Sequence, residues 1–489
     1  MAEHRATNIL VTGASGYVGS RLVLKLARSE GNVRSLVRDS RAFSSRFPDF
    51  KIDVREGDLL EPGSLKGHFN NIDVAFYLVH SLSSGEDFND KELECARNFM
   101  TAAKEAGVGR IIYLGGLAAP TNTLSRHLSS RRQVGEVLKS SNIPCIEFQA
   151  SIIIGSGGLS FEIIKSLVKR LPVMVTPKWV SSLAQPIWID DVISYLYEAS
   201  QLLFQDNIMV QIGGPDKLSY KELMREYGRQ SGYRRVMISV PVLTPRLSSL
   251  WLGLVTPAYA RVGRKLIDSL TADSVITDSS GMKVFKVEPI SYKEAISKEI
   301  ESENHPRVAS RWFDAVSSGT IKNSTYNTEQ KTFRYRFKDS RQIVLDLPVG
   351  QAFEPINQIG GPNGWYYANF LWRIRSWIDL ALGGVGMRRS RMTRNRFLIG
   401  DTLDWWRISE FREGAMVEFK AEMKLPGEAT LRFEVQKTGM TTTVSQVAQF
   451  STNSVLGCIY WYGLYPLHSL IFAGMLSAIG RKAMRNTGR

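Results

Sequence analysis

Asn8-Ile9-Leu10-Val11-Thr12 runs directly into Gly13-Ala14-Ser15-Gly16-Tyr17-Val18-Gly19, and a helical pattern begins at the end of this stretch. The first five residues are typical of a short apolar strand. In a strand-to-helix connection, Gly13 permits a tight turn, Gly16 lets the backbone approach a pyrophosphate, and Gly19 lets the helix pack on the sheet. The amide groups at the helix N-terminus face the anion. The stretch therefore predicts a dinucleotide-binding turn. The alternative is that the glycines only turn the chain.

Strand and helix patterns alternate over the first 150 residues. Apolar runs separated by helical segments and short turns imply parallel strands joined by right-handed crossovers. The sequence therefore predicts an α/β fold with a doubly wound parallel Rossmann sheet. Further strands are expected at 33–38, 54–58, 74–79, 110–114 and 145–148, with helices at 17–29, 87–106 and 131–140.

Three other motifs accompany the glycine turn, whose spacing is G-x-x-G-x-x-G. Gly57-Asp58-Leu59 follows the third strand, Tyr77-Leu78-Val79-His80-Ser81-Leu82 ends the fourth, and Gln185-Pro186-Ile187-Trp188-Ile189-Asp190-Asp191-Val192 lies downstream. With these motifs, residues 7–300 resemble the atypical short-chain dehydrogenase/reductase proteins, in the NmrA-like and complex-I-subunit-like branch. The cofactor-binding residues that the resemblance implies are Gly13, Ser15, Gly16, Tyr17, Val18, Arg38, Asp58, Leu59, Leu78, Val79 and His80.

The residue at the end of the second strand bears on the choice of cofactor. Enzymes that use NAD usually place a carboxylate there, whereas an arginine accommodates the 2′-phosphate of NADP. This chain has Arg38, whose guanidinium is suited to two parallel hydrogen bonds with a phosphate. Arg34 on the same strand either assists or is an ordinary solvated residue, and the neighbouring Asp39 keeps NAD as the alternative. We expect NADP(H).

The usual catalytic groups of this family are missing. Ordinary members carry a serine after the fifth strand and a Tyr-x-x-x-Lys on the next helix. Aligned on Glu136, this chain has Gly115, Leu128 and Arg132 at those three positions. Arg132 is suited to hold ribose or phosphate, but an arginine with a pKa above ~12 is a poor proton donor.

Few side chains are available to replace the missing acid. His80, at the end of the fourth strand, belongs to the residue type that titrates near neutrality. His127 lies beside the missing tyrosine, and Tyr113 lies on the fifth strand. Each has an ordinary explanation: His80 as a hydrogen-bonding loop residue, His127 as an exposed residue, and Tyr113 as part of the core. His80, Tyr113 and Arg132 are the catalytic candidates, and no metal site is expected.

The remaining chain predicts a substrate lobe, a linker and a second domain. Residues from about 156 to 300 are rich in apolar and small residues, including Val240–Ala260, so we expect the entrance to the substrate site to be apolar. Residues 301–332 contain Ser-Gly, Asn and Thr clusters typical of a linker. Within 333–489, strand patterns are separated by short runs of turn-forming residues typical of hairpins, and a long apolar segment follows them. The strands are expected at 416–425, 429–437 and 441–450, and the apolar segment spans Val455–Ala483.

This second domain resembles the α+β helix-grip fold of the START and polyketide-cyclase (SRPBCC) superfamily, in which a curved sheet wraps around a C-terminal helix. The resemblance implies an apolar cavity that holds a lipid-like ligand. A helix held in this way would be apolar on most sides without touching lipid. The candidate cavity residues are Tyr460, Trp461, Tyr465, His468 and Phe472.

The C-terminal region also raises the question of a membrane. No charged residue occurs from Thr438 to Gly480, and Val455–Ile479 is long enough to cross a bilayer by the ~20-residue criterion. A buried helix, a spanning helix and surface docking are the three interpretations, of which the helix-grip resemblance favours the first. A basic run is either an ordinary solvated loop or a docking segment, and as a docking segment it suits anionic lipid better than nucleic acid, because stacking aromatics are scarce around it. Its arginines are Arg388, Arg389, Arg391, Arg394 and Arg396.

Composition narrows the class of protein. The 489 residues are 43% hydrophobic with a net charge of +15, which fits two or three packed domains. Cys95, Cys145 and Cys458 lie far apart, so neither a disulfide framework nor a clustered cysteine metal site is expected. The N-terminus lacks the pattern of a secretory signal. These features predict a cytoplasmic protein, with membrane association as an alternative.

Together these features predict an NADP(H)-binding protein that acts on or gates an apolar, quinone-like or lipid-like molecule. The rival hypothesis is a non-catalytic sensor or assembly factor that binds NADP(H). The missing serine, tyrosine and lysine favour the sensor, whereas the apolar lobe favours the enzyme.

Overall fold

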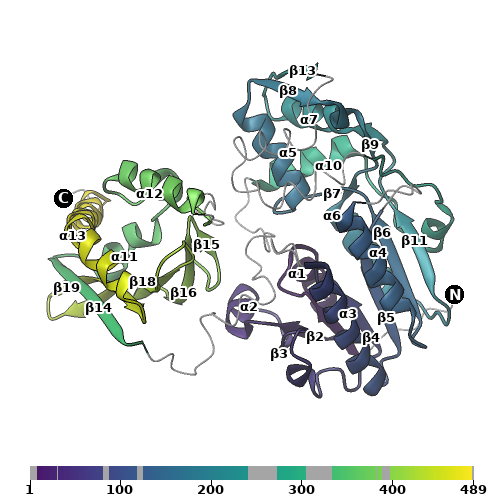
Figure 1. Cartoon of the computed structure of the whole chain (residues 1–489), viewed down its shortest axis with the longest axis horizontal. Coiled ribbons are helices and arrows are strands. Elements are labelled where there is room, and N and C mark those ends of the chain that lie inside the picture. Colours follow the sequence, from purple (N-terminus) through teal and green to yellow (C-terminus); the bar gives the residue numbers. More distant parts are fainter. Residues whose placement is uncertain are drawn as a thin grey trace. The chain divides into compact units, whose positions relative to one another are not determined.

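A computed structural model gives the fold of the chain (Figure 1). It describes residues 8–29, 31–80, 88–117, 125–240, 272–303, 333–382, 384–387 and 397–486. These fall into two compact units, one before and one after the segment 304–332. The five arginines of the basic run, most of Val240–Ala260 and nearly all of the expected linker lie outside the described residues.

The first unit is built on a seven-stranded sheet in the order β11-β6-β5-β4-β1-β2-β3, and every pair of neighbours is parallel. The expected doubly wound sheet is confirmed. Its elements are β1 (Asn8–Thr12), α1 (Tyr17–Ala27), β2 (Asn32–Val37), α2 (Ser40–Arg46), β3 (Asp53–Glu56), β4 (Val74–Tyr77), α3 (Phe88–Glu105), β5 (Arg110–Gly116), α4 (Arg126–Lys139), β6 (Cys145–Ala150), α6 (Ile189–Gln201) and β11 (Ile208–Ile212).

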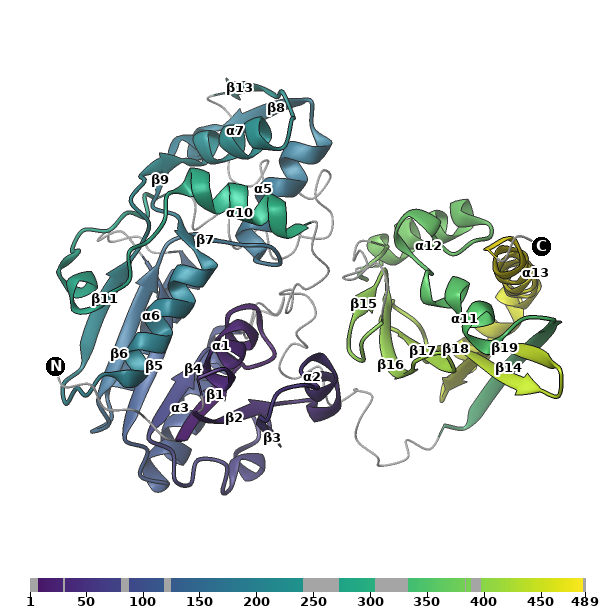
Figure 2. The same ribbon diagram turned by 180° about the vertical axis from the view of Figure 1, so that it is seen from behind.

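Helices cover both faces of this sheet, as Figures 1 and 2 show. One core packs α1, α2 and α6 on the sheet, and the other packs α3 and α4 on the opposite face. Strand β4 is buried throughout, which explains why its sequence is a continuous apolar run. The helix expected at 131–140 begins earlier, at Arg126, because the side chain of Ser125 accepts a hydrogen bond from the amide of Leu128 at 3.2 Å and caps it.

The lobe beside this sheet has a core of its own, which packs residues of α5, α7 and α10 with the short strands around them. Gly155 and Gly158 lie at its junction with the sheet, where a Cβ would meet the hydroxyl of Tyr17 at Gly155 and the ring of Tyr17 at Gly158. The lobe elements are β7 (Ile153–Ile154), α5 (Leu159–Arg170), β8 (Val173–Pro177), β9 (Leu183–Ala184), β10 (Ile187–Trp188), β12 (Leu218–Ser219), α7 (Tyr220–Gln230), β13 (Val236–Val240) and α10 (Tyr292–Glu303).

The second unit is an antiparallel sheet in the order β14-β19-β18-β17-β16-β15, with helices on it. The three hairpin strands expected from the sequence are β17, β18 and β19. Its elements are β14 (Tyr335–Leu345), α11 (Val349–Asn357), α12 (Asn369–Ala381), β15 (Thr402–Leu403), β16 (Trp406–Arg412), β17 (Met416–Ala421), β18 (Glu428–Thr438), β19 (Thr441–Thr452) and α13 (Val455–Asn486).

The expectation that the C-terminal helix is enclosed on most sides is wrong. Helix α13 buries one stripe against the sheet and α11, and leaves apolar side chains exposed along the rest. The expected cavity residues divide in the same way: Trp461 and Phe472 are buried, whereas Tyr465 is exposed. Trp461 stacks on Phe450 at 5.9 Å between ring centroids, so it fills space between helix and sheet. The antiparallel sheet with a long C-terminal helix is as expected, and a helix-grip identity stays a prediction.

Candidate functional site

The glycine turn lies at the carboxyl end of β1. Gly13 has φ of +71°, and the amide of Gly16 donates to its carbonyl oxygen at 2.9 Å. A Cβ on Gly13 would lie 2.5 Å from the carbonyl oxygen of Leu78, which follows the neighbouring strand β4. A Cβ on Gly19 would collide with the Gly13 carbonyl. Both the left-handed backbone and the close approach therefore require glycine here.

The start of α1 has the properties of an anion site. Its N-cap is Gly16, and no side chain caps the helix. The amide groups of the first turn therefore have no side-chain acceptor from the N-cap, and the helix dipole favours a negative charge in front of them. Ser15 and Val18 lie half-buried in the same turn. The turn fits the pyrophosphate of a nicotinamide dinucleotide.

The side chain of Tyr17 contributes to packing between the sheet and the lobe. Its hydroxyl is buried against Gly155, and this burial raises the pKa of the phenol well above its usual range. The guanidinium of Arg21 lies 4.3 Å from the centre of the ring and donates to the carbonyl of Ser156 at 2.8 Å. Tyr17 is one of the predicted cofactor-binding residues. In the structure its side chain packs against the lobe, and its backbone begins α1.

Three charged residues on or just after β2 have distinct surroundings. Arg34 donates to Asp53 of β3 at 2.8 Å and to the carbonyl of His68 at 2.8 Å, so it joins the two outer strands. The carboxylate of Asp39 accepts from the amide of Ala42 at 2.9 Å and caps α2. Arg34 is therefore held between strands, and one oxygen of Asp39 is engaged at the start of α2. Arg38 follows the last residue of β2 and is half-buried.

The Gly57-Asp58-Leu59 motif lies beside Arg38. The amide of Gly57 donates to the carbonyl of Val37 at 2.9 Å, which keeps the two strand ends together. Leu59 is buried, and the Asp58 carboxylate accepts from the amide of Leu60 at 3.0 Å. Burial, together with the nearby Asp58, raises the pKa of the Cys95 thiol to about 12, which excludes a reactive thiolate there.

A chain of polar groups lies where β4 ends. Nδ1 of His80 is 2.9 Å from Oε1 of Glu92 on α3, and the hydroxyl of Ser130 on α4 donates to Oε2 of the same carboxylate at 2.6 Å. Burial opposes ionisation of Glu92, but the hydrogen bond and charge of His80 outweigh it and lower the pKa of Glu92 to about 2. An ionised carboxylate only accepts, so Nδ1 of His80 carries the proton that they share.

His127 joins this group from α4. Its ring centroid lies 4.9 Å from that of His80, and its side chain is buried. The interpretation of His127 as an exposed residue is therefore wrong, because α4 begins before it and turns it inward. We call His80, Glu92, His127 and Ser130 the β4-end cluster.

Tyr113 and Arg131 line the same small pocket as His80 and Glu92. The hydroxyl of Tyr113 donates to the backbone carbonyl of Arg131 at 3.0 Å, and burial raises the pKa of the phenol well above its usual range. Tyr113 is therefore poorly suited to exchange a proton. Arg131 donates to the carbonyl of Leu114 at 2.8 Å, whereas the candidate Arg132 is exposed on α4 and does not line this pocket.

The surroundings of Gly115 leave little room for a side chain at this position. A Cβ at this position would lie 3.2 Å from the ring of Tyr113 and 3.3 Å from the carboxylate of Glu147, both tighter than ordinary contact. Sequence reasoning missed Glu92, Ser130 and Arg131. Glu92 had a signal, since it shares one helix face with the buried residues Cys95, Ala96 and Phe99.

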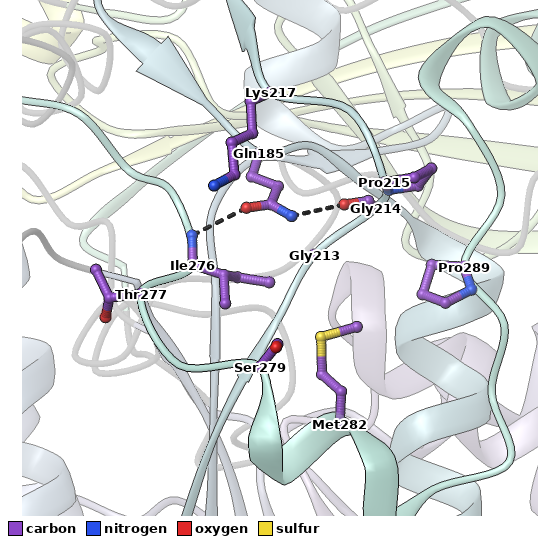
Figure 3. Close-up of a pocket in the computed structure, with 10 residues that line it drawn as sticks. All are labelled: Gln185, Gly213, Gly214, Pro215, Lys217, Ile276, Thr277, Ser279, Met282 and Pro289. Atoms are coloured by element: carbon purple, nitrogen blue, oxygen red, sulfur yellow. Dashed lines mark hydrogen bonds between the residues drawn. The ribbon is translucent and has the colours of Figure 1, made fainter.

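A second pocket lies after the edge strand β11, away from the glycine turn in strand order (Figure 3). The amide of Gln185 spans it, donating to the carbonyl of Gly214 at 2.7 Å and accepting from the amide of Ile276 at 3.0 Å. Lys217 is its one charged lining residue. None of the predicted cofactor residues lines this pocket. Within the described residues no cluster of three or more His, Cys, Asp or Glu side chains is arranged for a metal ion.

Comparison with known families matches each unit separately. Residues 5–163 match the NmrA-like family, and residues 332–475 match a family described as a protein of unknown function, DUF2867. A ceramide reductase of Caulobacter vibrioides is 25% identical over 271 residues, covering 54% of this chain and 84% of that protein. A dihydroflavonol 4-reductase of Zea mays is 31% identical over 134 residues, covering 24% of this chain and 36% of that protein.

Solved structures similar to the chain include proteins with either nicotinamide cofactor. The triphenylmethane reductase of Citrobacter sp., complexed with NADP(H), has a TM-score of 0.49 and 18% identity, and the match covers 60% of this chain and 99% of that chain. MoeE5, in complex with UDP-glucuronic acid and NAD, has a TM-score of 0.48 and 16% identity, covering 61% and 99%.

Proposed function

We propose that this chain, whose first unit is an NmrA-like NAD(P)-binding domain of the short-chain dehydrogenase/reductase type, is an NADP(H)-dependent reductase of a carbonyl group on an apolar, lipid-like or quinone-like molecule. The β4-end cluster carries the proposal. It lies at the end of the strand next to β1, whose own end forms the glycine turn. A proton donor and a hydride donor would therefore meet at neighbouring strand ends.

Reduction of a carbonyl needs one hydride at carbon and one proton at oxygen. A bound reduced nicotinamide supplies the hydride. His80 supplies the proton to the oxygen, which becomes a hydroxyl. Glu92 fixes the ring by accepting from Nδ1, so Nε2 is the nitrogen through which the proton passes. Ser130 in turn fixes the carboxylate, and solvent restores the proton to His80 after each turnover.

Arg38 supports NADP(H) over NAD(H). It directly follows the last residue of β2 and is half-buried, whereas Arg34 of the same strand is bound to Asp53 of β3. A guanidinium at this position matches the 2′-phosphate. The ceramide reductase of Caulobacter vibrioides, by its name a reductase of a lipid, supports the apolar substrate.

A single-turnover assay tests the reductase proposal. The protein loaded with NADPH is mixed with a long-chain aliphatic ketone, a quinone or acetone, and absorbance of NADPH is followed. We expect oxidation with one of the two apolar compounds and little with acetone. His80→Gln should slow the reaction on the order of 100- to 1000-fold. The matched control His68→Gln, a half-buried histidine outside the cluster, should leave the rate unchanged.

The absence of the usual serine, tyrosine and lysine favours a second candidate, a sensor or assembly factor that binds NADP(H) without turnover. Gly115, Leu128 and Arg132 stand at those positions. In that case NADPH should bind and protect the first unit from proteolysis, while no carbonyl compound oxidises it. If the parent protein does turn over, an equal rate for His80→Gln would contradict the role of His80 as the proton donor.

A further inference from the structure

Helix α13 carries an apolar surface that the fold of the second unit leaves uncovered. Seven of its large hydrophobic side chains between Val455 and Leu470 are 38–70% exposed. The surface extends over several turns, because these residues recur at helical spacing. We call it the α13 surface; its members are Val455, Leu456, Ile459, Tyr462, Tyr465, Leu467 and Leu470.

The opposite face of α13 is part of the core of the second unit. Its buried residues lie near the start of the helix, at Gly457 and Trp461, and then along its second half, at Ile471, Phe472, Met475, Leu476, Ile479, Gly480 and Ala483. The helix is the one described element long and apolar enough to cross a membrane, and one third of its most apolar window is buried. A spanning orientation would remove the buried stripe from the sheet and open the core. The helix is thus built to be covered by protein on one side only.

Helix α12 adds a second exposed apolar stripe nearby. Its exposed residues are 44–69% accessible along the helix and just after it. Arg375 of α12 acts electrostatically on His468 of α13, and a Cβ on Gly474 of α13 would meet the ring of Tyr367, just before α12. The two helices therefore adjoin, as Figures 1 and 2 also show. The α12 stripe comprises Phe370, Ile374, Trp377, Ile378 and Leu382.

The exposed charged residues of α12 and α13 themselves have a single sign. The chain has no Asp or Glu after Glu434, and the uncharged part of α13 ends in Arg481, Lys482 and Arg485. The acidic residue of α12, Asp379, is fully buried and accepts hydrogen bonds from backbone amides. Exposed charge on both helices is therefore basic, which complements anionic phospholipid headgroups.

We propose that the second unit docks on the surface of an anionic lipid bilayer, with the α13 surface in the interfacial layer and the α12 stripe beside it. Apolar side chains enter the boundary of the acyl chains, while Trp377, Tyr462 and Tyr465 provide rings of the kind found at headgroup depth. The basic end of α13 pairs with phosphate. The buried stripe keeps the helix parallel to the membrane and attached to its sheet. This surface is independent of the proposed reductase activity, because docking requires no nucleotide.

Vesicle sedimentation of the full chain tests this proposal. The vesicles are phosphatidylcholine alone, or phosphatidylcholine with phosphatidylglycerol at about three to one. We expect binding to the anionic vesicles that weakens with salt, since ~1 kcal/mol of attraction per basic residue is electrostatic. Ile459→Asp combined with Leu470→Asp should abolish binding. Replacing Arg481, Lys482 and Arg485 by Gln should weaken it on the order of 100-fold.

A matched control distinguishes binding through this surface from non-specific hydrophobic binding to vesicles. Met440, at the β18–β19 hairpin, is 95% exposed but belongs to neither helix, so Met440→Asp should bind vesicles like the parent protein. Near-UV circular dichroism of the buried tryptophans checks that each variant is folded. No vesicle binding by the parent protein overturns the proposal. A second result would also overturn it: the parent protein forms a dimer and binds no lipid, and the double variant Ile459→Asp with Leu470→Asp is monomeric. That result would identify a second copy of the chain as the partner of the α13 surface. Retention in membranes after alkaline carbonate washing would identify a spanning helix and overturn it too.

Discussion

The two units of this protein differ in what their helices leave exposed. In the first unit, α3 and α4 carry polar groups inward, where Glu92 and Ser130 bond to each other beside the end of β4. In the second unit, α12 and α13 carry apolar groups outward, including Trp377 and Ile459. An inward polar group and an outward apolar group are both costly unless something satisfies them. Our two proposals accordingly place a substrate beside the first of these departures and a lipid bilayer on the second.

The comparison also shows how a helix can be read wrongly from its composition. Helix α3 has an ordinary amphipathic pattern, and the single acidic residue on its buried face is the informative one. Helix α13 is apolar all round, which fits full enclosure, membrane spanning or one-sided docking equally well. The burial of one face argues against full enclosure, because it shows that protein covers only part of the helix.

The largest expected effect contrasts the two faces of α13. Met475→Ala removes a fully buried side chain and should lower the free energy of unfolding of the second unit by about 2–5 kcal/mol. Leu470→Ala, on the exposed face, should change it by less than about 0.5 kcal/mol. Urea titration followed by tryptophan fluorescence measures both. Equal losses would mean that the exposed face is covered within the folded chain.

The buried carboxylate of the first unit should appear in the pH dependence of stability. The folded-state pKa of Glu92 is about 2, below its ordinary value of 4.5. Its contribution is therefore complete above about pH 4.5 and is lost as the pH falls toward 2. Glu92→Gln should remove this contribution, about 3 kcal/mol at ~1.4 kcal/mol per pH unit, at neutral pH. Denaturant titration of the parent and variant from pH 7 to 2 should give curves that converge at the acid end; a constant difference would refute the assignment.

The smallest of these effects concerns cofactor choice at the end of β2. Arg38→Ala should reduce the preference for NADPH over NADH on the order of 10- to 100-fold, because one charge-assisted pair with the 2′-phosphate is lost. The matched variant Arg34→Ala, on the same strand but paired with Asp53, should keep that preference and lose some stability. Fluorescence titration with both nucleotides measures the ratio. Equal affinities of the parent protein for NADPH and NADH would remove the basis for NADP.

Much of the first unit could be predicted from the sequence, because its determinants are local. The strand before Gly13 and the spacing of the three glycines indicate the turn, and parallel strands buried on both faces leave continuous apolar runs. The β4-end cluster could be predicted only in part. His80 follows a recognisable strand, but Glu92 and Ser130 lie 12 and 38 residues from their partners in the chain, and only the packing of α3 against α4 brings them together.

The sequence by itself determined the parallel sheet, the glycine turn and the absence of acidic residues after Glu434. Hydrophobic periodicity and turn geometry depend on residues a few positions apart, so the elements that they specify can be recognised from the sequence. Only the tertiary structure decided that Arg34 pairs with Asp53, that His127 turns inward, and which face of α13 packs on the sheet. These depend on which partner a side chain meets across the fold. The sequence of a helix that is apolar on all sides does not indicate which face will be buried against the rest of the protein.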